Sequence, residues 1–219
     1  MLEFLALAAP QESMGQSLST TDTANMVARW LHITAGITWI GLLYFFNFIN
    51  GAFTAKLSAG AKQEVVPELM PRALFWFRWG AAFTWITGVI LFLLVYWGKS
   101  VMYDGGVPGE GGLSNRTVWI LLGGLFGTVM AFNVWFIIWP AQKQIIPKVK
   151  AGEAPDAALA KRATMASKVN TYLSVPLLLT MISNSIPSLF AYELFGSNHA
   201  FLMVNVIIGL VFVKVLYMI

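Results

Sequence analysis

The chain has 219 residues, of which 58% are hydrophobic and only 11% are charged, and its formal net charge is +4. A soluble domain of this length needs more charge to cover its surface, so the composition indicates an integral membrane protein. The sequence contains no cysteine, which excludes disulfides, thiolate metal sites, iron–sulfur clusters and covalent c-type haem within it. The basic residues cluster in two loops, as membrane topology requires, so the positive charge does not indicate a nucleic-acid partner.

Apolar blocks of roughly 17 residues or more recur along the chain, and each is long enough to cross a hydrocarbon core of about 30 Å. Lipid offers no hydrogen-bond partner to free backbone groups, so such blocks are expected to be α-helices. We therefore predict an all-α integral membrane protein, a bundle of about five transmembrane helices surrounded by membrane lipid. The predicted spans are residues 26–50, 74–97, 117–139, 172–195 and 199–219.

No soluble domain is predicted outside the spans. Residues 1–25 are expected to form a flexible leader or a surface segment, and residues 26–219 a single transmembrane domain. A polar loop is expected after the first span, and Pro140 is expected to stop the third. Residues 155–168 are expected to form a short helix that leads into the fourth span.

The distribution of Lys and Arg predicts the orientation of the bundle. The two loops expected on one side carry nine basic residues, whereas the opposite side holds only Arg29, Lys99 and Arg116. Positive charge favours the cytoplasmic side, so we expect the N-terminus outside and the C-terminus inside. The nine residues are Lys56, Lys62, Arg72, Lys143, Lys148, Lys150, Lys161, Arg162 and Lys168.

The two histidines of the chain, His32 and His199, both lie at the predicted outer ends of their spans. Two imidazoles at one depth on two helices are able to ligate the iron of one b-type haem from both faces. Arg29, three residues before His32, would then pair with a haem propionate, and Gly36 would leave room for the flat macrocycle. The alternative is that both histidines are interfacial residues hydrogen-bonded to water or backbone.

Polar residues inside the spans suggest further contacts. Arg78 lies near the inner end of the second span, where it either snorkels to the headgroups or lies near a contact in a hetero- or homo-oligomeric assembly. Four asparagines lie in four different spans, and we expect their amides to tie helices together. They are Asn47, Asn133, Asn184 and Asn205.

Three segments carry a family resemblance: ARWLHITAGITWIG at 28–41, AFNVWFIIWPAQKQII at 131–146 and LLLTMISNSIPSLF at 177–190. Together they resemble the membrane domain of bacterial membrane-bound urate oxidase, also called urate hydroxylase. The resemblance implies a multi-pass protein of the bacterial inner membrane that is linked to electron transfer, and His32 falls on the family's first-span histidine. Two departures are the absence of a C-terminal cytochrome c domain and the triplet Ser183-Asn184-Ser185, where the family motif reads Ser-Asn-His.

Three functional hypotheses follow. The first is a redox protein or subunit that holds one haem b between His32 and His199 and exchanges electrons with other membrane subunits or an external cytochrome c. The second is a cofactor-free structural or assembly subunit of a larger complex. The third is a membrane oxidase that acts on urate or a porphyrin, and the missing histidine at Ser185 weighs against urate.

Overall fold

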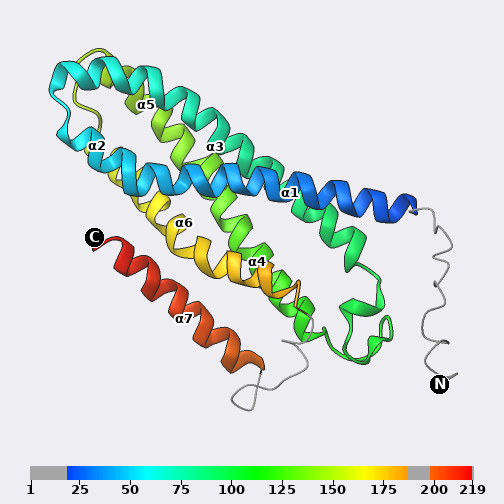
Figure 1. The fold of residues 1–219 in the computed structure, drawn as a ribbon. Helices are drawn as coiled ribbons and strands as arrows, with labels where there is room; N and C mark the ends of the chain where they lie inside the picture. The colour runs from blue at the N-terminus through cyan, green and yellow to red at the C-terminus, as the bar shows by residue number, and fades with distance from the viewer. Residues whose placement is uncertain (1–18, 187–197, 219) are drawn as a thin grey trace, which may run out of the picture.

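The computed structural model describes residues 19–186 and 198–218, and these form a bundle of five long helical rods (Figure 1). Within these residues every element is helical, apart from one isolated bridge between Tyr103 and Leu113. The first rod joins α1, η2 and α2; the second is α3; the third joins α4, η5 and α5; the fourth and fifth are α6 and α7. Their bounds are α1 Thr20–Tyr44, η2 Phe45–Asn50, α2 Gly51–Lys56, α3 Ala59–Val95, α4 Asn115–Phe132, η5 Asn133–Ile138, α5 Trp139–Lys150, α6 Ala157–Ser183 and α7 Asn198–Leu216.

This architecture confirms an all-α membrane protein. Among the described residues three rods are long and apolar enough to cross a membrane: Thr20–Lys56, Ala59–Val95 and Asn115–Lys150. Large apolar side chains point outward along them, as on Ile37, which is 68% exposed, and Phe136, which is 65% exposed. A water-soluble surface does not carry so continuous an apolar cover, whereas lipid solvates it.

Three predicted boundaries were wrong. The helix of the first span starts before residue 26, because the Ser19 hydroxyl accepts a hydrogen bond from the Asp22 amide and caps α1. The polar loop after the first span is almost entirely helical, since Ser58 caps α3 in the same way. Pro140 does not end the third rod: it lies just after the π-helical turn η5, whose wider hydrogen-bond register accommodates a residue without an N–H.

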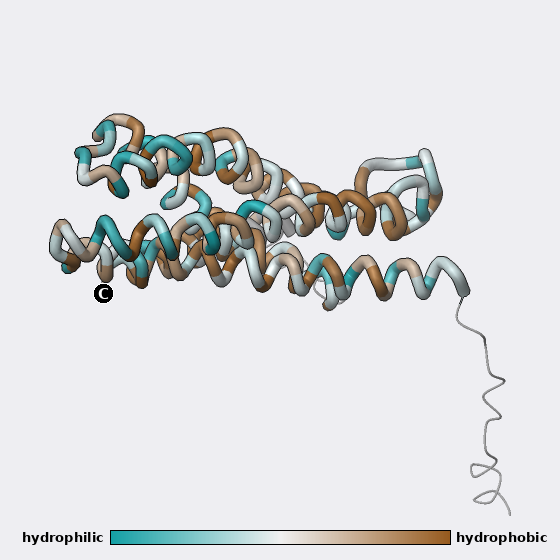
Figure 2. The backbone as a smooth tube through the Cα atoms, turned by 90° about the horizontal axis from the view of Figure 1, so that it is seen from above, coloured by the Kyte–Doolittle hydropathy of each residue, from teal (hydrophilic) through white to brown (hydrophobic). Residues whose placement is uncertain are grey.

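The fourth rod also differs from its prediction. One continuous helix, α6, runs from Ala157 to Ser183. The short helix predicted at 155–168 is therefore the first part of this rod and is not a separate element. The end predicted for this span at residue 195 lies outside the described residues, and so does most of the predicted leader. Figure 2 shows hydrophilic residues gathered at the end of the bundle that holds α2, the start of α3 and the end of α5.

The core is built where helices approach closely. Trp39 of α1 and Phe77 of α3 are each only 1% exposed, and they belong to one buried cluster with Met130 and Val134 of the third rod. Gly80 permits the approach of α1 to α3, because an added Cβ there would lie 3.2 Å from the Trp39 amide nitrogen. These contacts fix which faces of the first three rods point inward.

Side-chain amides tie the rods together at three of the four asparagines for which the sequence predicted this role. Asn133 donates a hydrogen bond of 2.8 Å to the side chain of Asn170 on α6. Asn47 donates to Ser167 of α6 and accepts from Tyr217, which follows α7. Asn184 links the end of α6 to the neighbouring rods, and the side chain of Asn205 lies outside the described part.

Candidate cofactor site

His32 lies on α1 where this helix packs against α3, and its side chain is half-buried. Its Nδ1 atom is 3.2 Å from Oγ1 of Thr87. The Thr87 hydroxyl also contacts the Phe83 carbonyl oxygen at 2.6 Å, and a carbonyl can only accept, so the hydroxyl proton points to Phe83. Thr87 therefore accepts from His32, which places the imidazole proton on Nδ1. In the neutral ring, Nε2 then carries the free lone pair.

Gly88 makes room for this imidazole. A Cβ at Gly88 would lie 3.1 Å from Cε1 of His32 and 3.5 Å from its Nδ1. The separation of 3.1 Å is tighter than ordinary van der Waals contact, so a larger residue would push the ring away from α3. Thr87 and Gly88 thus hold the imidazole in place together, one by a hydrogen bond and the other by its small size.

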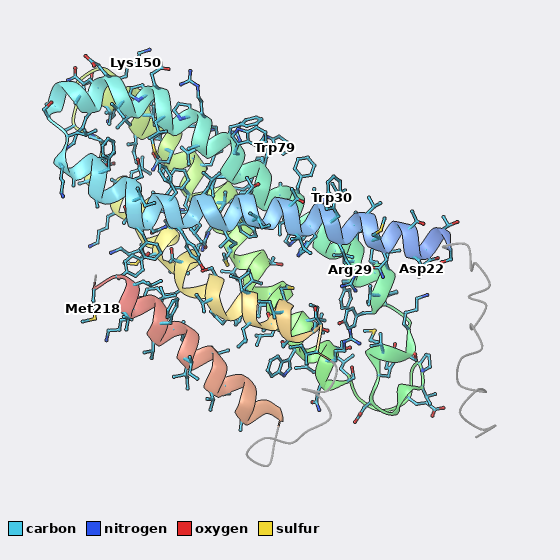
Figure 3. The ribbon with its side chains drawn as sticks, in the orientation of Figure 1. Asp22, Arg29, Trp30, Trp79, Lys150 and Met218 are labelled. Carbon is cyan, nitrogen blue, oxygen red and sulfur yellow. The ribbon has the colours of Figure 1, made fainter. Side chains whose placement is uncertain are left out.

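Arg29 lies one turn before His32 on α1, and its side chain is exposed. Its Nε donates a hydrogen bond of 2.7 Å to the Asn25 side chain. The guanidinium is also close enough to Tyr96, at the end of α3, to interact electrostatically with the phenol. Figure 3 shows Arg29 at the edge of α1 that the C-terminal half of α3 passes.

Gly36 lies on the contact between α1 and α3. An added Cβ would meet Cγ2 of Thr84 at 3.8 Å, which is ordinary contact distance. The residue therefore faces the neighbouring helix, and the space that it was expected to leave for a macrocycle stays a prediction.

A second polar group at this end of the bundle consists of Tyr96, Arg116 and Asn184. Arg116, at the start of α4, donates from Nε to Asn184 Oδ1 at 2.9 Å and from Nη2 to the Asn184 carbonyl oxygen at 3.0 Å. The Tyr96 hydroxyl donates to the same Oδ1. Asn184 is 8% exposed, and its buried Nδ2 has no hydrogen-bond partner among the described residues. The cluster thus holds a positive charge beside an unused amide donor.

The sequence did not reveal this cluster as a unit. Asn184 was expected only to tie helices together, and Arg116 counted only toward topology. The available signal was the position of Asn184 inside the segment 177–190, at the centre of the triplet that departs from the family motif. Arg116 follows a glycine-rich stretch, YDGGVPGEGGLSN at 103–115, but it lies 68 positions before Asn184 in the sequence.

The structure does not bring the two histidines together in its described part. His199 belongs to the first turn of α7, and its side chain lies outside the described residues. The end of α7 meets the first rod through Tyr217, whose ring centroid is 5.2 Å from that of Phe48. From there α1 and α7 diverge toward the end that carries the histidines (Figure 1). Ligation of one iron by both imidazoles therefore stays a prediction.

The arrangement around His32 suits one kind of metal site better than others. No group of three or more His, Cys, Asp or Glu side chains gathers anywhere in residues 19–186 and 198–218. A haem needs only one or two protein ligands, because its macrocycle supplies the other four. A histidine that ligates a metal typically donates its second ring N–H to a fixed acceptor, as His32 does to Thr87.

No curated protein and no solved structure matches the chain. A family described as "Urate oxidase N-terminal" matches residues 57–104 and 110–219, which include Thr87, Arg116 and Asn184 but not His32. These ranges cover well over half of the sequence, so the chain belongs to the urate oxidase N-terminal family.

Proposed function

We propose that this chain is a membrane redox protein, or the redox subunit of a larger membrane complex, and that His32 would hold the iron of one b-type haem. The observation that carries the proposal is the hydrogen bond from His32 to Thr87. That bond fixes the Nδ1–H tautomer, so Nε2 is left with the lone pair that a metal ion requires. When bound, a haem supplies one-electron transfer.

The residues at the same end of the bundle as His32 fit the anionic edge of such a group. Arg29 and Arg116 bring two permanent positive charges to this end of the bundle, and neither forms an ion pair within the described part. Haem propionates are carboxylates, which accept hydrogen bonds from guanidinium groups and from amides such as the unused Nδ2 of Asn184. His199 is the second candidate ligand, and it would serve only if the outer end of α7 approached α1.

The proposal includes the location of the haem in the membrane and its electron partners. The expected orientation puts His32 near the outer face of a bacterial inner membrane, with the N-terminus outside. Electrons would pass to or from other membrane subunits, or an external cytochrome c. The proposal does not include urate oxidation, because Ser185 stands where the family motif carries a histidine.

A cofactor-free structural subunit is the second candidate. It is favoured by the aromatic cover of the bundle, as on Trp76, which is 61% exposed, because another subunit could pack there as well as lipid. In that role the hydrogen bond between His32 and Thr87 would serve only to join α1 to α3.

Reconstitution with haemin tests the proposal. Purified protein in mild detergent is titrated with haemin, and the Soret band is expected to saturate at one haem per chain. His32→Ala should abolish saturable binding, whereas Thr34→Ala, an exposed change one half-turn away on α1, should leave it intact. Equal binding by wild type and His32→Ala would reject His32 as the ligand and favour the structural subunit.

A further inference from the structure

Arg78 of α3 is enclosed by aromatic rings of its own helix and of the third rod. Its guanidinium carbon lies 3.9 Å from the ring centroid of Trp139, 5.7 Å from that of Phe75 and 5.9 Å from that of Trp135. Trp135 also donates a hydrogen bond of 3.0 Å to the Arg78 carbonyl oxygen, which fixes α3 against η5. The Nε atom of Arg78 is buried and has no hydrogen-bond partner among the described residues.

A second cation shares the Trp139 indole. The Nζ atom of Lys143, one turn further along α5, lies 5.8 Å from the centroid of that ring. The one ion pair within the described residues joins Arg72 to Glu68, so neither Arg78 nor Lys143 has an acidic partner there. Cation–π contact offsets part of the cost of each charge, but the pair keeps a net positive charge. Two cations on one ring therefore favour a bound anion.

The tryptophans place this pair at one surface of the membrane. At a rise of 1.5 Å per residue, about 24 Å of α3 lies between Trp79 and the end of the helix at Val95, just before Trp97, and about 30 Å separates Trp119 from Trp139. Both lengths match the hydrocarbon core, and tryptophans concentrate at its two edges. Arg78 and Trp139 therefore lie at the level of the glycerol and phosphate groups, on the side expected to be cytoplasmic.

The side chains around the two cations are suited to lipid tails. Phe75, Trp76, Trp79 and Phe136 lie on α3 and η5 close to Arg78 or Trp135 in the sequence, and they are between 39% and 65% exposed. Trp79 (labelled in Figure 3) packs edge-on against Trp135 of η5, with 5.5 Å between the ring centroids, and 39% of the residue stays exposed. An anion that binds here must carry apolar groups that cover this aromatic surface, which distinguishes a lipid from a free ion.

We propose that Arg78 and Lys143, whose charged groups lie 3.9 Å and 5.8 Å from the centroid of the Trp139 ring, bind the phosphate of an anionic phospholipid. Arg78 donates hydrogen bonds to the phosphate oxygens, and Lys143 contributes a second charge from one turn further toward the water. The acyl chains lie against the exposed aromatic rings of α3 and η5. This site is independent of the haem proposal, because it lies at the opposite end of the predicted hydrocarbon span.

Native mass spectrometry with added lipid tests this inference. Wild-type protein in mild detergent is titrated with phosphatidylglycerol or with phosphatidylcholine of the same acyl chains. Loss of a charge-assisted contact predicts that Lys143→Gln lowers the preference for phosphatidylglycerol by about tenfold. Arg78→Gln should lower it at least as much, and Arg78→Lys should keep part of it. Lys143 is exposed, so its variant is expected to fold.

The matched control removes two charges from the same end of the bundle but away from Trp139. Lys148→Gln combined with Lys150→Gln should keep the preference, and excess inorganic phosphate should not compete with the lipid. Three results would overturn the inference: no preference in wild type, an equal loss in the double control, or a lipid-free dimer that Arg78→Gln dissociates. The last result would assign the charge to a contact between subunits.

Discussion

His32 and Thr87 join the first two rods through one hydrogen bond, with 3.2 Å between Nδ1 and Oγ1. The Thr87 hydroxyl gives its own proton to the Phe83 carbonyl, so it acts toward the imidazole as an acceptor. The bond therefore sets both the rotation of the ring and the nitrogen that stays free. The functional proposal rests on this free nitrogen.

Replacement of Thr87 should weaken haem binding even though the proposed ligand, His32, is still present. Thr87→Val keeps the shape of the side chain but removes the acceptor, so we expect haem affinity to fall about 10–100-fold, as for other partners of metal-bound histidines. Thr87→Ser keeps the hydroxyl and should bind close to wild type. Haemin titration measures both, and an unchanged affinity in Thr87→Val would show that the bond has no part in ligation.

The cluster at Asn184 should contribute to stability. Asn184→Leu removes the acceptor that Tyr96 and Arg116 share and leaves their donors without it, which should cost about 1–3 kcal/mol. Ser185→Ala is the control, because that neighbouring side chain is exposed. Thermal unfolding in detergent compares the two variants with wild type. Equal melting temperatures for Asn184→Leu and Ser185→Ala would contradict the structural role of the amide.

Gly123 and Gly124 should respond to alanine in opposite ways. A Cβ at Gly123 would overlap the Thr180 side chain and lie 2.9 Å from Cε of Met181, whereas nothing lies within 4 Å of one at Gly124. Gly123→Ala should therefore destabilise the contact of α4 with α6 by about 1–3 kcal/mol. Gly124→Ala should be neutral or stabilise the helix by up to about 1 kcal/mol. Thermal unfolding compares the melting temperatures of the two variants. Equal changes in melting temperature would show that Gly123 does not face α6.

The sequence predicted the class of fold because long apolar blocks in lipid must form α-helices, which satisfy their own backbone hydrogen bonds. It also singled out His32, because an imidazole beside an apolar run is conspicuous. It did not identify Thr87 as its partner, since spans that are apolar on all sides carry no periodic signal of which face points inward. The contact between Arg116 and Asn184 could not be predicted for the same reason, because it depends on which faces α4 and α6 turn toward each other.

Helix ends were harder to predict than helix positions. Pro140 signalled a stop because proline removes an amide donor, yet the π-helical turn at 133–138 lets the rod continue to Lys150. The polar residues between the first two predicted spans, 51–73, were also expected to form a loop, although all of them except Leu57 and Ser58 are helical. Polar residues outside the membrane form helices as readily as loops when a cap such as Ser58 starts them.

The orientation of the bundle has a direct test. A reporter fused next to Lys150 should read cytoplasmic, and one fused next to Gly111 should read external, because basic residues concentrate at the first of these two ends. Both positions lie between rods, so an insertion there should leave the bundle intact. The reverse pattern would move His32 to the cytoplasmic side and would exclude an external electron partner for it.

The reduced-minus-oxidised visible spectrum of the protein, purified from cells supplied with a haem precursor, shows directly whether His32 binds haem. We expect a low-spin b-type spectrum in wild type that His32→Ala loses while it keeps its helical content by circular dichroism. His199→Ala should convert the spectrum to high spin if that residue is the second ligand, and leave it unchanged if it is not. A wild-type protein without haem absorbance, or a His32→Ala protein with the wild-type spectrum, would exclude His32 as a haem ligand.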